Sequence, residues 1–247
     1  MFENPFSKLV FSVCQKFVEA KSGRCLDIGC GNGDLVAEFI DMGYDAYGSD
    51  VEFKTGKNLD DLCSKDKLRK ILISGVGRAD IGSSNAQYAY PFIDESFDFI
   101  FSRAVIEHVF NHYEFAQENF RVLKDGGIAI HYFPSKFSLI ECHTGILFGA
   151  LFQNLQYYRF MCKLGLCYSS YKGKGADALK YMQNSTCYLD SMKIIQIFEE
   201  NGLRLVARPT SLILKYFGQG RFYLISKIPF ATMVWRKFRT EVIVFEK

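Results

Sequence analysis

The sequence predicts an α/β fold with a doubly wound, mostly parallel sheet. A strand, a glycine-rich loop, a helix and a second strand follow one another over residues 24–50. Apolar runs at 97–101 and 128–133 have the length and composition of strands covered on both faces. Helical periodicity separates these two runs over residues 112–124. Strands that alternate with helices are typical of Rossmann-like folds, in which helices cover both faces of the sheet.

The composition fits one domain with a complete hydrophobic core, because 49% of the 247 residues are hydrophobic. The eight cysteines form no C-x-x-C pair and show no metal-site spacing with the four histidines. We therefore expect neither a disulfide framework nor a bound metal. The N-terminal segment has no signal-peptide pattern, so a cytoplasmic location is expected.

Charge is divided unevenly along the chain. Residues 1–135 contain 14 Lys and Arg against 20 Asp and Glu, a net charge of −6, and residues 136–247 contain 16 against 7, a net charge of +9. An acidic half suits a cationic cofactor, and a basic half suits an anionic acceptor or an acidic membrane surface. A solvated basic face without a partner is the alternative.

The strand–loop–helix–strand unit has the features of a nucleoside-binding site. Gly29, Gly31 and Gly33 alternate directly after the strand at 25–28. Glycines let the backbone turn tightly and approach a ligand, and the helix that follows offers free N–H groups. Asp50 ends the second strand 21 residues after Gly29, the spacing expected of an acid that accepts hydrogen bonds from ribose hydroxyls.

The ligand expected here is cationic rather than a dinucleotide. A dinucleotide site needs G-x-G-x-x-G, but the sixth position is Asp34, and an acid repels a pyrophosphate. The string LDIGCGNG resembles motif I of the class I S-adenosylmethionine-dependent methyltransferases, whose cofactor carries a sulfonium and an ammonium group. A glycine-rich turn without a ligand is the alternative.

Two later stretches carry a second resemblance. YPFIDESFDFIFSRAVIEHV at 90–109 contains the pattern P-F-x-D-x-S-F-D…S-x-x-V-x-E-H-V of the type-11 methyltransferase group. FRVLKDGGIAIHYFP at 120–134 is similar to the same group, and SLIECHT at 138–144 resembles a subset with Glu-x-His after the fifth strand. Because these segments match in order and spacing, residues 24–134 resemble the cofactor-binding core of that group.

The resemblance implies which residues bind S-adenosylmethionine. Asp27 would orient the loop and the ammonium end of the cofactor, and Val51 would pack on adenine. The adenine amino group would meet Asp80, with Asn85 and Gln87 as alternatives. The full set, in which the last two line the methionine end, is Asp27, Gly29, Gly31, Gly33, Asp50, Val51, Asp80, Ser102 and Arg103.

Methyl transfer to a hydroxyl is helped by a general base with a pKa near neutrality. His108 lies in the E-H-V pattern, where a structural role beside the cofactor is the alternative. His143, with Glu141, follows the fifth strand, where acceptor-side loops are expected; its alternative is a lid histidine with a backbone partner. We expect His143 rather than His108 to be the catalytic base. His131 alternates with apolar residues in a strand and is expected in the core.

Residues 135–187 are expected to form a helical, lid-like insertion. Residues 145–166 are unusually apolar and predict a helix, but no 18-residue window is free of polar residues, which excludes a membrane span. A lid over the active site is preferred to a dimer face or a helix at a membrane interface.

Residues 188–247 are expected to contain a helix capped by Asp190 and a closing antiparallel strand pair at 203–207 and 241–245. Residues 208–240 hold seven basic residues and the only Trp. This composition suits lipid headgroups; nucleic acid is not expected, because no nucleic-acid-binding module is present. Elsewhere, a helix is expected at 2–21 and short strands at 71–73 and 86–89.

The chain is thus predicted to be one methyltransferase domain, 1–247, made of a cofactor-binding core (24–134), the insertion (135–187) and a C-terminal part (188–247). The expected function is methyl transfer from S-adenosyl-L-methionine, with S-adenosyl-L-homocysteine as product, to an oxygen or nitrogen atom of a small or lipid-linked acceptor. Peripheral membrane contact is expected to accompany a lipid-linked acceptor, and no oligomeric state is predicted. A catalytically inactive binding or assembly domain is the alternative, and a nicotinamide-dependent oxidoreductase is a weaker one.

Overall fold

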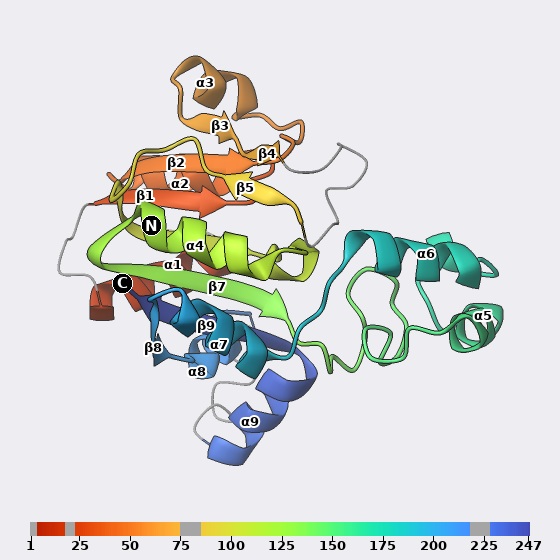
Figure 1. Cartoon of the computed structure of the whole chain (residues 1–247). Coiled ribbons are helices and arrows are strands. Elements are labelled where there is room, and N and C mark those ends of the chain that lie inside the picture. Colours follow the sequence, from red (N-terminus) through yellow and green to blue (C-terminus); the bar gives the residue numbers. More distant parts are fainter. Residues whose placement is uncertain (1–3, 18–22, 75–84, 218–227) are drawn as a thin grey trace.

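A computed structural model describes residues 4–17, 23–74, 85–217 and 228–247 of the chain. The strands of its main sheet are β1 (Arg24–Ile28), β2 (Asp45–Asp50), β3 (Leu68–Lys70), β6 (Phe97–Arg103), β7 (Leu123–Pro134), β8 (Arg204–Ala207) and β9 (Thr240–Glu246). Within the described ranges these seven strands have the order β3-β2-β1-β6-β7-β9-β8 (Figure 1). β9 runs antiparallel to both of its neighbours, and the other paired strands are parallel. The predicted doubly wound, mostly parallel sheet with a closing antiparallel strand is confirmed.

The strand order reverses beside β1, because β1 pairs with β2 on one side and with β6 on the other. In open α/β sheets, ligands bind outside the carboxyl ends of the strands at such a reversal. A separate antiparallel pair, β4 (Leu72–Ser74) and β5 (Gln87–Ala89), lies near this edge. The topology therefore predicts a ligand site at the carboxyl ends of β1, β2 and β6.

Helices cover both faces of the sheet. One face packs against α1 (Pro5–Phe17), α2 (Asp34–Asp41), α3 (Leu59–Ser64) and α8 (Thr210–Phe217), and the other against α4 (His112–Val122) and α7 (Ser191–Glu200). Aromatic rings pack in both layers. On the first face the ring centroids of Phe39 and Phe101 lie 4.9 Å apart, and on the second the stacked rings of Phe198 and Phe245 have centroids 4.5 Å apart. The sheet is thus held rigidly between two apolar layers.

The chain between β7 and α7 forms a lobe beside the sheet (Figure 1). Its helices, α5 (Leu155–Lys163) and α6 (Gly175–Ser185), surround a small core of their own that includes Tyr158, Cys162 and Met182. α5 and α6 approach closely at Gly175, where a Cβ would lie 2.6 Å from the backbone of Arg159. We call residues 135–187 the insertion.

The helix expected over 145–166 is wrong in its first half, where the structure has turns. Gly145 and Phe148 adopt left-handed backbone conformations, with φ of 74° and 48°. Helix α5 begins only after Asn154, whose side chain accepts a hydrogen bond from the N–H of Tyr157 at 2.9 Å. The helix expected over 112–124 ends two residues early, because Leu123 already pairs with Phe97 in the sheet.

The C-terminal part matches its prediction in the helix and strands. Asp190 caps α7 by accepting from the N–H of Met192 at 2.9 Å, and β8 pairs with β9. The sequence analysis did not predict α6, α8 or α9 (Pro229–Phe238). None of the helices in the described part of the chain is long and apolar enough to cross a membrane.

Candidate active site

The glycine-rich loop joins β1 to α2 and is tied to the end of β2. Gly29, Gly31 and Gly33 all have positive φ, between 57° and 78°. Oδ2 of Asp50 accepts a hydrogen bond from the N–H of Gly31 at 2.8 Å. Glycine is the residue that adopts this backbone conformation without strain. The expected proximity of the loop and Asp50 is therefore present.

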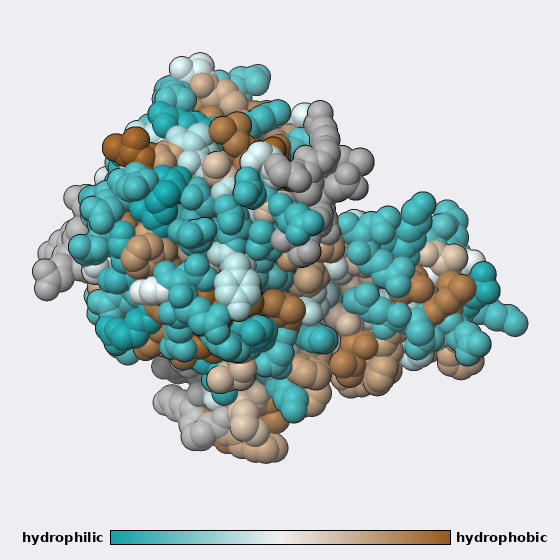
Figure 2. All heavy atoms as spheres, in the orientation of Figure 1, coloured by the Kyte–Doolittle hydropathy of each residue, from teal (hydrophilic) through white to brown (hydrophobic). Residues whose placement is uncertain are grey.

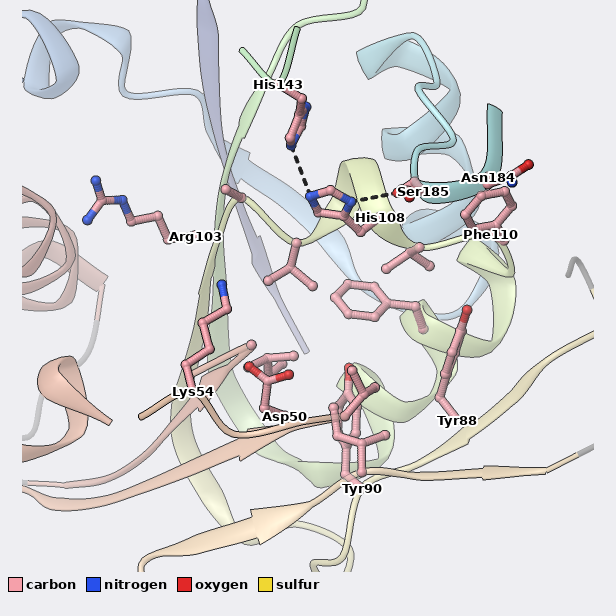
Figure 3. A pocket seen from close by; sticks show the side chains of 18 of the residues that line it. Asp50, Lys54, Tyr88, Tyr90, Arg103, His108, Phe110, His143, Asn184 and Ser185 are labelled. Carbon is pink, nitrogen blue, oxygen red and sulfur yellow. Dashed lines mark hydrogen bonds between the residues drawn. The ribbon is translucent and has the colours of Figure 1, made fainter. Parts of the chain in front are cut away.

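A cavity of about 680 Å³ lies at the carboxyl ends of β1, β2 and β6 (Figure 3). Asp50 and Lys54 lie at one end of it, and His108 and His143 at the other. His108 belongs to the short helix η2 (Ile106–His108), which follows β6. The insertion completes the wall with Tyr181, Asn184 and Ser185 of α6, as well as His143.

The structure gathers six of the predicted site residues around this cavity: Gly29, Asp50, Val51, Arg103, His108 and His143. Gly31 and Gly33 shape the loop behind it. Ser102 does not line the cavity, because its side chain is fully buried and hydrogen-bonded to Nδ1 of His131 at 2.8 Å. His131 is in the core, as expected.

The predicted contact to the adenine amino group concerns three residues. Asp80 lies outside the described residues. Of its two alternatives, neither Asn85 nor Gln87 is among the described residues that line the cavity. Gln87 instead accepts a hydrogen bond from Ser74 at 3.2 Å across the β4–β5 pair. The assignment of Asp80 stays a prediction.

Asp27 lies beneath the loop and is only 2% exposed. Its Oδ2 atom has no hydrogen-bond partner within the described ranges. Burial raises the pKa of this carboxyl well above its usual value; the charge of Asp50 raises it further, and Arg103 opposes the shift. A buried carboxylate with a free oxygen is a place where a cationic group gains a strong interaction.

The two predicted catalytic histidines are in direct contact. Nε2 of His143 lies 3.1 Å from Nε2 of His108. Nδ1 of His108 lies 2.6 Å from the carbonyl oxygen of Ser185 (Figure 3). Nδ1 of His143 lies 2.7 Å from Oε1 of Glu141. Both carbonyl and carboxylate oxygens only accept, so each Nδ1 carries a hydrogen.

Glu141 is the buried anchor of this cluster. Its carboxylate accepts hydrogen bonds from the N–H and hydroxyl of Thr144 at 2.7 and 2.8 Å and from the hydroxyl of Tyr188 at 2.9 Å. Burial opposes ionisation, but the hydrogen bonds from His143 and Thr144 prevail and lower the pKa of Glu141 to about 2. Burial likewise opposes protonation of His143, but its contacts with Cys142 and Glu141 raise the pKa of His143 to about 10.

These directions bear on the choice of base. Burial lowers the pKa of His108, and the charge of His143 adds to this effect. A histidine that keeps its proton at neutral pH is a poor general base, so the pKa directions favour His108 over His143. That His143 is the base, as expected from the sequence, stays a prediction.

Glu107 was not singled out by the sequence analysis. It is 1% exposed, and both of its carboxylate oxygens lack a hydrogen-bond partner in the described part of the chain. Burial raises the pKa of Glu107 to about 7. Its place beside His108 in the E-H-V pattern was the signal in the sequence. Tyr181 and Ser185 were missed because helix α6 was missed, although Ala178, Leu179 and Met182 have helical spacing.

Comparison with known proteins adds to this geometry. A family model described as a methyltransferase domain matches residues 26–131. This part of the chain is similar to methyltransferase domains. The resemblance to the class I, type-11 group is thereby confirmed, and it supports S-adenosylmethionine as the cofactor. No curated protein sequence gave a match.

Solved structures of methyltransferases share the fold of this chain. An S-adenosylmethionine-dependent methyltransferase from Mesorhizobium loti is 13% identical with a TM-score of 0.55, and the match covers 96% of this chain and 97% of that chain. Phosphoethanolamine N-methyltransferase 2 of Haemonchus contortus, in complex with S-adenosylmethionine, is 15% identical with a TM-score of 0.54. This match covers 96% of this chain and 51% of that chain. A Haloferax volcanii methyltransferase bound to the Trm112 activator is 14% identical with a TM-score of 0.52. This match covers 96% of this chain and 88% of that chain. At these identities the likeness shows the fold alone.

Proposed function

We propose that this chain is an S-adenosylmethionine-dependent methyltransferase that acts on an oxygen or nitrogen atom of a small or lipid-linked acceptor. The observation that carries the proposal is a single cavity with a nucleoside-binding edge at one end and a polar histidine cluster at the other. The family match over residues 26–131 supports the same reaction. The activated methyl group comes with the cofactor, so the protein has to position the acceptor.

The residues at the Asp50 end fit the cofactor. Asp50 offers carboxylate oxygens to ribose hydroxyls, and Val51, which is 43% exposed, offers an apolar surface to adenine. The free oxygen of Asp27 suits the ammonium group. Gly29 permits the close approach of the methionine part. The Haemonchus contortus structure with this fold is a complex with S-adenosylmethionine, which supports the choice of cofactor.

The acceptor belongs at the other end of the cavity. His108, His143 and Ser185 supply polar contacts there, while Phe110 and Tyr181 supply apolar and aromatic surface. Such a mixture binds an organic molecule with one or two polar groups. Since most of this wall comes from the insertion or the segment after β6, these elements are where acceptor choice is expected to be made.

Support for a lipid-linked acceptor comes from the outer surface. Helix α9 exposes Phe230 (69%) and Met233 (49%), and its last turn carries Arg236 and Lys237. Phe238 of α9 contacts Phe148 of the insertion, with ring centroids 6.5 Å apart. Figure 2 shows hydrophobic residues gathered along the lower edge of the molecule, over α9 and the neighbouring part of the insertion. Large exposed apolar patches mark interaction sites, and basic residues beside them favour anionic headgroups.

Several large apolar side chains of α9, of Ile228 just before it and of the insertion are exposed. We give the name apolar edge to this set, which is Leu147, Leu151, Phe152, Leu155, Ile228, Phe230, Met233 and Val234.

Calorimetric titration of S-adenosylmethionine and S-adenosylhomocysteine into the purified chain tests the proposed function, with NAD as the negative control. The decisive variant is Asp50→Asn. The Asn oxygen can still accept from Gly31, so the loop is kept, but the amide cannot accept two ribose hydroxyls. We expect at least about tenfold weaker binding. Asp45→Asn is the matched control, because Asp45 starts the same strand and pairs with Arg24 and Lys67 outside the cavity.

A screen with labelled S-adenosylmethionine against hydroxyl- and amine-bearing small molecules and lipids then identifies the acceptor. If neither sulfur ligand binds, the enzyme proposal fails, and a binding or assembly role for the methyltransferase fold takes its place. If the cofactor binds equally well to wild type and Asp50→Asn, the assigned nucleoside edge is wrong.

A further inference from the structure

The facing nitrogens of His108 and His143 pose an electrostatic problem. Because each Nδ1 carries the hydrogen that it donates, to Ser185 or to Glu141, each neutral imidazole has its lone pair on Nε2. The two Nε2 atoms are 3.1 Å apart. Two lone pairs at that distance repel each other unless a cation lies between them, which is either a proton or a metal ion.

Glu107 distinguishes these two cations. One carboxylate oxygen of Glu107 and one ring nitrogen of each histidine all lie within 4.8 Å of one another. The Glu107 side chain is 1% exposed and has no hydrogen bond to either oxygen within the described residues. A buried carboxylate without partners is costly, and most such groups are paired or bind a metal. A proton shared by the histidines would leave Glu107 unpartnered, whereas a metal ion would use all three groups.

We propose that Glu107, His108 and His143 bind one divalent transition-metal ion on the wall of the cavity. With metal–nitrogen bonds of about 2.0–2.1 Å, as for zinc, two nitrogens 3.1 Å apart subtend roughly 100° at the ion, which lies between octahedral and tetrahedral angles. The two histidines also have the second hydrogen bond typical of metal ligands. Ligating histidines donate their other N–H to a carbonyl or a carboxylate, which are here those of Ser185 and Glu141.

The donor set narrows the choice of ion. Two imidazoles and one carboxylate suit zinc and other divalent first-row metals, whereas calcium and magnesium prefer oxygen ligands alone. The neighbouring group Glu141, Cys142 and His143 could also hold a metal by distance. We assign Glu141 an orienting role instead, because its oxygens already accept hydrogen bonds from Thr144, His143 and Tyr188.

Three protein ligands leave a coordination position open to the cavity, since His108 and His143 both line it. This position suits an oxygen atom of the acceptor. A metal-bound hydroxyl loses its proton to water more readily, so with the ion bound His108 acts as a ligand and a histidine base is not needed. The oxygen then forms a bond to the methyl carbon, the carbon–sulfur bond breaks with its electron pair passing to sulfur, and S-adenosylhomocysteine leaves. This role rests on the proposed function, but metal binding itself does not.

The test uses the untagged full chain, stripped with EDTA and dialysed. Zn²⁺ is titrated by calorimetry, and Co²⁺ is followed by its visible absorption. We expect one equivalent of each to bind, and at least tenfold weaker binding in Glu107→Gln, His108→Gln and His143→Gln. Glu107→Gln is the most informative variant, because it removes a buried charge without breaking a hydrogen bond seen in the described structure, so the EDTA-treated variant should melt no lower than wild type.

Cys142→Ser is the control, since Cys142 belongs to the competing group but not to the proposed one. Unchanged zinc affinity in Cys142→Ser supports the proposal, and loss of affinity there overturns the ligand assignment. Absence of binding to wild type, or equal binding to Glu107→Gln, overturns the proposal and leaves a shared proton between the histidines. Because no cofactor is present, a failure here is distinct from a failure to bind S-adenosylmethionine.

Discussion

A Cβ atom on Gly29 would lie 2.3 Å from Cγ2 of Val105. Gly29 follows β1 and Val105 follows β6, so the ends of two paired parallel strands meet at this contact. Both residues also line the cavity. The contact therefore sets the distance between the glycine loop and the segment that carries Glu107 and His108.

Gly29→Ala should lower the free energy of unfolding by about 2–5 kcal/mol, because the left-handed backbone costs about 1–2 and overpacking about 1–3. Gly43→Ala is the matched control. Gly43 has φ of 89°, but a Cβ there would meet nothing within 4 Å, so only the backbone cost applies. Denaturant unfolding measures both variants. Adding Val105→Ala to Gly29→Ala should recover the part due to the collision, and equal losses at Gly29 and Gly43 would contradict this account.

Asp27→Asn is expected to stabilise the ligand-free protein in a pH-dependent way. Burial raises the pKa of Asp27 in the folded chain. The charge of Asp50 raises this pKa further, and the charge of Arg103 lowers it by less. The folded chain thus binds this proton more tightly than the unfolded chain, so stability falls as pH rises above about 4, the usual pKa of Asp. Asn has no such proton. The Tm of the variant minus that of wild type should therefore increase between about pH 4 and pH 7.

The same substitution should weaken S-adenosylmethionine binding, because the charge that faces the ammonium group is lost. Stability and affinity would then change in opposite directions, as is common for groups kept for binding. Thermal melts at several pH values and calorimetry at neutral pH measure the two effects. A Tm difference that does not vary with pH would show that Asp27 titrates alike in both states.

The nucleoside edge could be predicted from sequence because its parts are close in the chain and have strong local patterns. Gly29, Gly31 and Asp50 lie within one strand–loop–helix–strand unit, and the Asp50–Gly31 bond spans only 19 positions. The start of α9 was also readable, since proline occupies its first turn, but basic and aromatic residues around it were interpreted as a surface segment. The helix expected over 145–166 fails at Phe148, because this apolar residue at helical spacing adopts a positive φ.

The histidine cluster could not be assembled from sequence. His108 and His143 are 35 positions apart, and Ser185 is 77 positions from His108. Neither spacing is that of a known local metal or catalytic motif, and only the packing of the insertion against the end of β6 brings the three together. For Glu107 the sequence offered only its place in the E-H-V pattern, because burial without a hydrogen-bond partner is a property of the fold rather than of the local sequence.

Tyr181→Ala should alter the acceptor rather than the cofactor. The ring of Tyr181 lies 5.7 Å from that of His143, and Tyr181 lines the cavity from α6. Once an acceptor is known, its KM should rise at least severalfold, while the Kd of S-adenosylmethionine stays the same. Tyr113→Ala provides the control, because Tyr113 is 47% exposed on α4 outside the cavity. If S-adenosylmethionine bound more weakly while the KM of the acceptor stayed the same, Tyr181 would belong to the cofactor end of the cavity and this prediction would be wrong.

The apolar edge is expected to bind acidic membranes. Phe230 and Met233 are exposed on α9 beside Arg236 and Lys237, so insertion of the side chains and attraction to anionic headgroups act together. In sedimentation with vesicles, the chain should bind phosphatidylserine-containing lipid, and less so at high salt. Phe230→Ser with Met233→Ser should reduce binding at least about tenfold, since burying each side chain contributes roughly 1.5–3 kcal/mol. Ile93→Ser is the control, because Ile93 is 78% exposed just before β6, at the opposite edge of the sheet. Wild-type binding that equals that of the double variant would remove the support for a lipid-linked acceptor and leave a small soluble one.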